Sequence, residues 1–212
     1  MQEVYVMRIV IIGATGRVGS HIVELALKDR HHVTALVRNP DNLQVEDRNL
    51  TVVVGNALNQ ENLAHAIKGA DVVISALNTD GTTTLSESMP LLIESMYNEG
   101  IQRIITIGTA GILQSSISPE LLRYQSSESK RKSTRAAEEH HRVYTLLQQS
   151  TLDWTIVCPT YLPDGERIGT YRVERDVLPE GGVEISVMDT AEFAYKQIKD
   201  QSYIRSRVGI SY

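Results

Sequence analysis

The sequence is poor in cysteine, in basic charge and in long apolar runs. Its only cysteine is Cys158, so no internal disulfide can form, and a reducing compartment is expected. The net charge is −5, which excludes the broad basic surface of a nucleic-acid-binding protein. The longest uncharged stretch, Ile104–Pro119, is rich in polar residues and too short to span a bilayer. We therefore expect a soluble, cytoplasmic protein with neither a nucleic acid nor a membrane as partner.

The remaining composition is that of a globular protein. Of the 212 residues, 42% are hydrophobic and 22% charged, so bulk disorder is excluded. Apolar runs rich in Val and Ile recur along the chain, and most are continuous, as in strands that are covered on both faces. These runs are Val4–Ile12, His32–Val37, Thr51–Val54, Asp71–Ser75, Arg103–Ile107 and Trp154–Cys158.

Helical patterns lie between these runs, with apolar residues three or four positions apart. The first has Val18 and Ile22 on one face, and the last has Val143 and Leu147. Strands that alternate with helices at this spacing favour right-handed crossovers and a parallel sheet. We predict an α/β fold: a doubly wound, mostly parallel sheet of the Rossmann type, with helices on both faces, formed by residues 1–212 as a single domain.

The last quarter of the chain has a different pattern. Gly169–Glu174 and Val183–Val187 are short and strand-like, and Arg207–Ile210 is a candidate closing strand. Asp189 is a candidate N-cap for a helix over Ala191–Lys199. Because this segment is too short for an independent domain, we predict a small C-terminal cap on the sheet.

The strongest local signal is the glycine-rich turn Gly13-Ala14-Thr15-Gly16-Arg17-Val18-Gly19, between the first strand and the first helix. Gly13 permits a tight turn out of the strand. Gly16 lets a pyrophosphate approach the backbone, and Gly19 lets the helix pack closely on the sheet. The helix N-terminus then presents unpaired N–H groups to the phosphates. This placement predicts dinucleotide binding.

The end of the second strand indicates which dinucleotide. An NAD site usually has a carboxylate there for the ribose 2′-OH, whereas an arginine suits a 2′-phosphate. The chain has Arg38 and no acid before Asp41, and Arg17 could add a second positive charge. We predict NADP rather than NAD; the alternative is that Arg38 is a surface residue at a strand end.

Together with Val54-Gly55-Asn56-Ala57 and Thr155-Ile156-Val157-Cys158-Pro159, these features resemble the atypical short-chain dehydrogenase/reductase group. Within it the chain is most similar to NAD(P)H-binding proteins related to flavin reductase/biliverdin-IXβ reductase and to NmrA-like proteins. The resemblance runs nearly end to end, including the segment from Gly169-Thr170-Tyr171.

The resemblance implies a role for each matching position. The residues implied to line the pyrophosphate are Gly13, Thr15, Gly16, Arg17 and Val18, with Arg38 at the 2′-phosphate. Those implied for the rest of the cofactor are Asn56 and Ala57 near the adenine, Ala76 and Leu77 near the adjoining ribose, Thr109 on the nicotinamide side, and His140 near the nicotinamide ribose.

The chain departs from its relatives at three positions. Relatives commonly have Asp at the position of Asn56, and the flavin reductase has a basic residue at that of Asn42, which weakens the argument for NADP. The flavin reductase also has His at the position of Tyr161. A phenol can stack on a flavin and donate a hydrogen bond, but it cannot shuttle protons at neutral pH as His can. Biliverdin-type reduction is therefore in doubt, whereas hydride transfer to a flavin or quinone is not.

Most short-chain dehydrogenases use a Tyr-x-x-x-Lys pair, in which the Lys lowers the Tyr pKa from about 10. The helix expected to carry it contains Ala136-Ala137-Glu138-Glu139-His140-His141 instead. Tyr195 and Lys199 have the spacing on the last helix, which we interpret as coincidence. The adjacent His140 and His141 point about 100° apart on a helix and cannot share a metal, so no metal site is expected.

The leading hypothesis is an NADPH-dependent reductase of small planar acceptors such as flavins or quinones, with FMN as one candidate. Thr109 and Tyr161 would border the acceptor, since proximity supplies much of the rate in such a transfer. A second hypothesis is an NAD(P)-binding redox sensor of the NmrA-like type that acts through a protein partner without turnover. A third is a catalytically idle domain. The sequence leaves open the acceptor and the choice between monomer and dimer.

Overall fold

The structure is a computed structural model that describes residues 5–129 and 131–212. Within these residues, one eight-stranded sheet has the order β3-β2-β1-β4-β5-β6-β8-β7. All neighbouring strands pair in parallel except β7 and β8, which are antiparallel. The strands are β1 (Arg8–Ile12), β2 (His32–Val37), β3 (Leu50–Val54), β4 (Val72–Ser75), β5 (Arg103–Ile107), β6 (Asp153–Pro159), β7 (Arg172–Arg175) and β8 (Ser206–Ser211).

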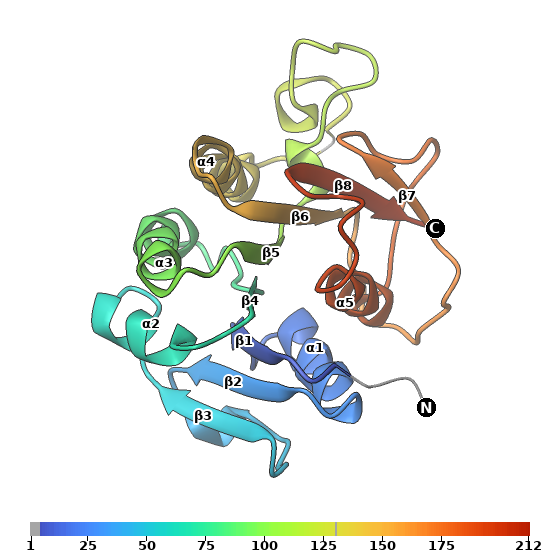
Figure 1. Cartoon of the computed structure of the whole chain (residues 1–212). Coiled ribbons are helices and arrows are strands. Elements are labelled where there is room, and N and C mark those ends of the chain that lie inside the picture. The colour runs from blue at the N-terminus through green and yellow to red at the C-terminus, as the bar shows by residue number, and fades with distance from the viewer. Residues whose placement is uncertain (1–4, 130) are drawn as a thin grey trace.

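Helices cover both faces of this sheet (Figure 1). One face carries α1 (Arg17–Lys28) and α5 (Val187–Lys196), which pack against each other. The other carries α2 (Gln60–Ile67), α3 (Thr84–Glu99) and α4 (Arg135–Gln149). Short 3-10 helices are η1 (Pro40–Asn42), η2 (Ala110–Ile112) and η3 (Arg123–Gln125). The predicted doubly wound, mostly parallel α/β fold is confirmed.

The continuous apolar runs are explained by the two cores that the sheet separates. Successive strand residues point to opposite faces, so Ile9 and Ile11 contribute to the core under α1 and α5. Val10 and Ile12 contribute to the core under the other helices. A strand buried on both faces needs apolar residues at every position, which is the pattern that identified β1.

The structure differs from the sequence predictions at both ends of the chain. The first strand begins at Arg8 rather than at Val4, which lies outside the described residues. The predicted strand over Val183–Val187 is wrong, because this segment makes a single bridge from Glu184 to Tyr161 before α5 begins at Val187. The remaining part of the C-terminal segment adds β8 and the antiparallel β7 to one edge of the sheet.

The predicted N-cap of the last helix is also wrong. Ser186 is the N-cap, and its side chain accepts a hydrogen bond from the backbone N–H of Asp189. Asp189 lies in the first turn of α5, where its carboxylate is directed at a loop outside the helix. Both residue types are common caps, so composition alone did not distinguish them. No helix in the described part of the chain is both long and apolar enough to cross a membrane.

Candidate dinucleotide-binding site

Most of the predicted cofactor and acceptor residues lie at one edge of the sheet, because they follow the carboxyl ends of parallel strands; His140 lies on α4 instead. The turn at Gly13 follows β1, and Ala76 and Leu77 follow the adjacent β4. Chain order reverses between these two central strands, and open α/β sheets bind ligands in the crevice at such a switch point. The positions that follow the other strands are Arg38 after β2, Asn56 and Ala57 after β3, Thr109 after β5 and Tyr161 after β6.

The glycine turn is closely packed against the neighbouring strand end. Gly13 has φ +82°, and a Cβ there would lie 2.7 Å from the carbonyl carbon and oxygen of Ala76. A Cβ on Gly19 would lie 2.1 Å from the carbonyl oxygen of Gly13. That oxygen also accepts a hydrogen bond of 3.0 Å from the Gly16 N–H. The start of α1 therefore lies directly against the turn, as the sequence predicted.

The N-terminus of α1 is suited to bind an anion. Gly16 is its N-cap and provides no side-chain hydrogen bond, and the first turn contains no acidic residue. The positive end of the helix dipole and the uncapped N–H groups are then directed to the carboxyl edge of the sheet. Thr15 is exposed on the turn, whereas Val18 is buried in the core under α1. Val18 therefore offers a phosphate its backbone N–H and not its side chain.

Arg17 has partners that the sequence did not predict. Its guanidinium donates to the Asp164 carboxylate at 2.7 Å and to the Leu162 carbonyl at 2.7 Å. Both partners belong to the segment that follows β6. Arg17 thus lies beside the predicted pyrophosphate position while it holds a distant loop against the turn.

Arg38 is exposed and has no hydrogen bond or ion pair with any other residue that the structure describes. Its guanidinium is therefore free to contact a phosphate at the end of β2. Asn56 also has a local role, since its Oδ1 accepts from the Leu58 N–H at 3.0 Å. This turn leaves the Asn56 side-chain NH₂ available to an adenine, whereas Ala57 is buried. The adenine contacts stay a prediction.

Thr109 is half-buried at the end of β5 and caps η2. Its Oγ1 accepts from the Gly111 N–H at 3.4 Å, which leaves the hydroxyl hydrogen free to donate. Gly111 in turn lies against α4, where a Cβ on it would be 3.1 Å from the Ala137 Cβ. The loop after β5 therefore packs closely on α4 at Gly111.

His140 and Tyr161 lie in opposite environments. His140 is buried on α4, and burial lowers its pKa to about 4 despite the nearby Glu139. Its ring is therefore neutral near pH 7 and adds no charge to a phosphate site. Tyr161 is 59% exposed, and its phenol makes no hydrogen bond within the described chain. It follows β6 and pairs through its backbone with Glu184.

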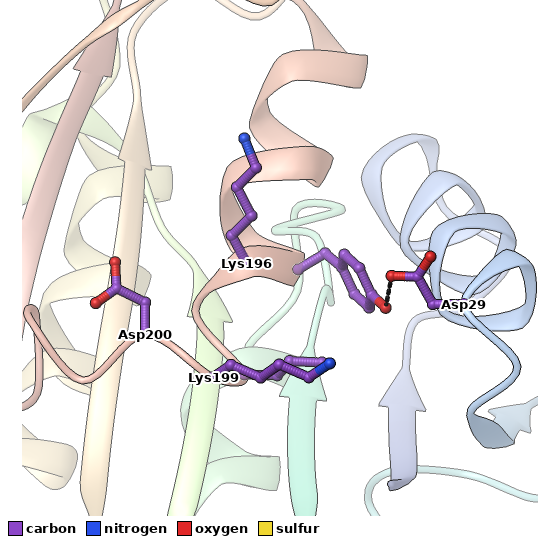
Figure 2. A pocket seen from close by; sticks show the side chains of 6 residues that line it. Asp29, Lys196, Lys199 and Asp200 are labelled. Carbon is purple, nitrogen blue, oxygen red and sulfur yellow. Dashed lines mark hydrogen bonds between the residues drawn. The ribbon is translucent and has the colours of Figure 1, made fainter. Parts of the chain in front are cut away.

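Tyr195 lies in the last turn of α5, whereas Lys199 follows the end of the helix at Lys196, so the helix predicted to reach Lys199 ends earlier. Both residues lie at the edge of the sheet opposite the glycine turn, and Figure 2 shows Lys199 beside this pocket. The Tyr195 hydroxyl donates to Asp29 at 2.7 Å. Burial raises the pKa of Tyr195, and the bond to the Asp29 carboxylate raises it further. A catalytic tyrosine needs a lowered pKa instead. The pair borders a cavity of about 440 Å³ with Asp29, Lys196, Ile198 and Asp200, which is not part of the carboxyl-edge site.

Sequence reasoning missed the residue that anchors the segment after Tyr161. The buried Asp189 carboxylate accepts hydrogen bonds from the N–H groups of Ile168 and Gly169, each at 2.9 Å, and from the Tyr212 hydroxyl at 2.7 Å. Burial alone raises its pKa, but these bonds outweigh that effect and hold the pKa of Asp189 below its ordinary value. No local pattern signals this role, because the donors lie about 20 residues away on both sides.

The chain is similar to known proteins over most of its length. The NAD(P)H-binding family model matches residues 13–201. An uncharacterized protein of Bacillus subtilis, YwnB, is 30% identical over 193 residues, which are 87% of this chain and 89% of that protein.

Two solved structures superpose on nearly the whole chain. A candidate epimerase from Bacteroides thetaiotaomicron superposes with a TM-score of 0.85 at 29% identity, covering 98% of this chain and 97% of that one. A candidate NADH-flavin reductase from Streptococcus pneumoniae has a TM-score of 0.83 at 25% identity, covering 97% and 99%. By the family match and the glycine turn together, the chain belongs to the NAD(P)H-binding family.

Proposed function

We propose that the protein is an NADPH-dependent reductase that passes hydride to a small planar acceptor such as a flavin or a quinone. The observation that carries this proposal is the pairing of two features at one sheet edge. The uncapped N-terminus of α1 is packed against the glycine turn, and the exposed Arg38 follows the neighbouring strand. The first feature suits a pyrophosphate and the second a 2′-phosphate.

Different residues at this edge would bind different parts of the cofactor. The N–H groups of the first α1 turn would hold the pyrophosphate, and the Arg38 guanidinium would bind the 2′-phosphate through two N–H donors. Ala76 and Leu77, whose backbone closes on Gly13, would border the ribose. When bound, the cofactor supplies the hydride, and the protein supplies binding and orientation.

Thr109 and Tyr161 would form the acceptor side. The Thr109 Oγ1 accepts from the Gly111 N–H at 3.4 Å, and its hydroxyl hydrogen can be donated to a carbonyl or ring nitrogen. The exposed Tyr161 ring offers a flat surface on which a planar acceptor can stack. The proposed hydride transfer asks for no proton from either side chain, because its rate depends on the proximity of the nicotinamide and acceptor rings.

The Streptococcus pneumoniae structure supports a flavin as the acceptor, since that protein is described as a flavin reductase. That protein is a candidate NADH-flavin reductase, whereas Arg38 favours NADPH in this chain. The cofactor preference is therefore part of the proposal and is tested with both nucleotides.

A second candidate function is NAD(P) binding without turnover, as in a redox sensor with a protein partner. The place of Tyr195 favours it, because the hydroxyl with Tyr-Lys spacing donates to Asp29 at the edge of the sheet opposite the glycine turn. The two candidates differ in turnover and not in cofactor affinity.

The test is NADPH oxidation with FMN or a quinone and substoichiometric protein. We expect multiple turnovers that fall in Thr109→Val and Tyr161→Leu. The matched controls are Thr51→Val, an exposed threonine on β3, and Tyr97→Leu, a partly exposed tyrosine on α3. Tight NADPH binding without turnover on either acceptor would refute the reductase and support the sensor.

A further inference from the structure

Three exposed cations lie at the start of α4. Arg131 and Lys132 come shortly before this helix, and Arg135 is its first residue. Because α4 connects β5 to the parallel strand β6, it runs back across the sheet and begins at the carboxyl edge. Residues 131–135, called the basic segment here, therefore lie at the same edge as the predicted cofactor and acceptor residues.

The basic segment lies next to the loop that carries Thr109. The Gly111 N–H donates to the Thr109 Oγ1 at 3.4 Å. A Cβ on Gly111 would lie 3.1 Å from the Cβ of Ala137, in the first turn of α4, and 3.5 Å from the Cβ of Tyr124, in η3. The chain between η3 and α4 thus leaves Gly111 and returns to it, so the basic segment belongs to the acceptor side of the site.

The positive charge of the basic segment has no partner within the described chain. Its three cationic side chains make no hydrogen bond or ion pair with residues 5–129 or 131–212. The acidic side chains nearest in the sequence accept hydrogen bonds from other residues: Glu128 from Arg123 at 2.6 Å, Glu138 from the Thr134 hydroxyl at 2.7 Å and Glu139 from the Ser86 hydroxyl at 2.8 Å. An excess of positive charge is therefore exposed beside the predicted acceptor.

A phosphate group suits this arrangement of side chains. A guanidinium can donate two parallel hydrogen bonds to a phosphate, and a lysine ammonium adds a point charge. A phosphate monoester carries a charge of about −1.5 to −2 at pH 7, so more than one cation is needed to balance it. With its ring beside Thr109, a planar acceptor could direct a phosphate on its side chain to the basic segment.

We propose that the basic segment binds a phosphate on the acceptor, and that the site therefore selects phosphorylated planar acceptors over uncharged ones. FMN is then bound in preference to riboflavin or to a quinone without an anionic group. The inference rests on the proposed function and narrows its acceptor class. Arg131, Lys132 and Arg135 determine specificity and do not contact the reacting ring.

The experiment compares two flavins that share the ring and differ in the phosphate. FMN and riboflavin are titrated against the protein by flavin fluorescence, with saturating NADP⁺, which fills the dinucleotide site and supplies no hydride. We expect the wild type to bind FMN more tightly than riboflavin. The triple variant Arg131→Gln, Lys132→Gln, Arg135→Gln should bind FMN about three- to thirty-fold more weakly, the combined effect of losing three exposed ion pairs, and riboflavin with unchanged affinity.

The matched control removes the same charge at the opposite edge of the sheet. The triple variant Lys28→Gln, Arg30→Gln, Lys199→Gln replaces exposed cations there and should keep the wild-type affinity for both flavins. Equal losses of FMN affinity in the two triple variants, equal affinity of the wild type for FMN and riboflavin, or no FMN binding would overturn the proposal. Failure of the reductase is read separately, as absence of NADPH oxidation by a protein that still prefers FMN.

Discussion

The substitution Gly19→Ala sets two physical effects against each other. Gly19 lies inside α1, where alanine is favoured over glycine by about 1 kcal/mol. However, the new Cβ would lie 2.1 Å from the Gly13 carbonyl oxygen and 3.2 Å from the Ala14 Cα. These are backbone atoms that cannot rotate away, so the start of α1 must shift. Overpacking costs about 1–3 kcal/mol in general, and this contact belongs at the upper end.

The net expectation is a loss of about 2 kcal/mol, because the clash exceeds the gain in helix propensity. For a chain of this size that is a fall in Tm of about 4–8 °C. The shift also separates the first-turn N–H groups from the turn, so NADPH affinity should fall as well. The assays are thermal unfolding and NADPH titration, with Ser20→Ala, the next residue of α1, as control. A Gly19→Ala protein as stable as Ser20→Ala would refute the close packing of helix and turn.

Three further predictions concern single side chains. Arg38→Ala should weaken NADPH binding by about 1.5–3 kcal/mol, the value of a charged hydrogen bond, and leave NADH binding nearly unchanged. Equal losses of affinity in titrations of both nucleotides would show that Arg38 does not contact the 2′-phosphate. Asp189→Asn should cost about 2–4 kcal/mol in urea unfolding at pH 7. Because the folded pKa of Asp189 lies below its unfolded value, this stabilisation is present above about pH 4 and is lost as the pH falls through the folded pKa. If the difference in unfolding free energy between wild type and Asp189→Asn does not narrow at low pH, this prediction is wrong. Tyr195→Phe should lose about 1 kcal/mol of stability with its bond to Asp29 and retain full turnover; a large loss of kcat would place Tyr195 in the reaction.

The position of the Tyr195 hydroxyl bears on whether this residue can act as an acid in the proposed reaction. Tyr195 has a strongly raised pKa and lies at the amino edge of the sheet, away from the predicted cofactor. At the carboxyl edge lie Thr109 and the exposed Tyr161, the two residues proposed to border the acceptor. The proposed hydride transfer between two aligned rings would therefore proceed without Tyr195 as an acid.

The sequence by itself determined the parts of the structure that depend on local chemistry. The glycine turn could be predicted because Gly13 and Gly19 occupy positions where any Cβ would collide with backbone. The parallel strands could be predicted because burial on both faces requires unbroken apolar runs. Once those strands are parallel, Arg38 and Thr109 must follow their carboxyl ends, and so lie at one edge.

The tertiary structure alone decided the contacts that join distant segments. Arg17 and Asp164 are 147 residues apart, and nothing in either neighbourhood marks them as partners. Asp189 looked like a helix cap, yet the N–H groups of a loop about 20 residues away direct its carboxylate. Such contacts depend on which loops the packed helices and strands bring together. The spacing of apolar residues predicts which face of a helix or strand is buried, but it does not predict which distant residue that face contacts.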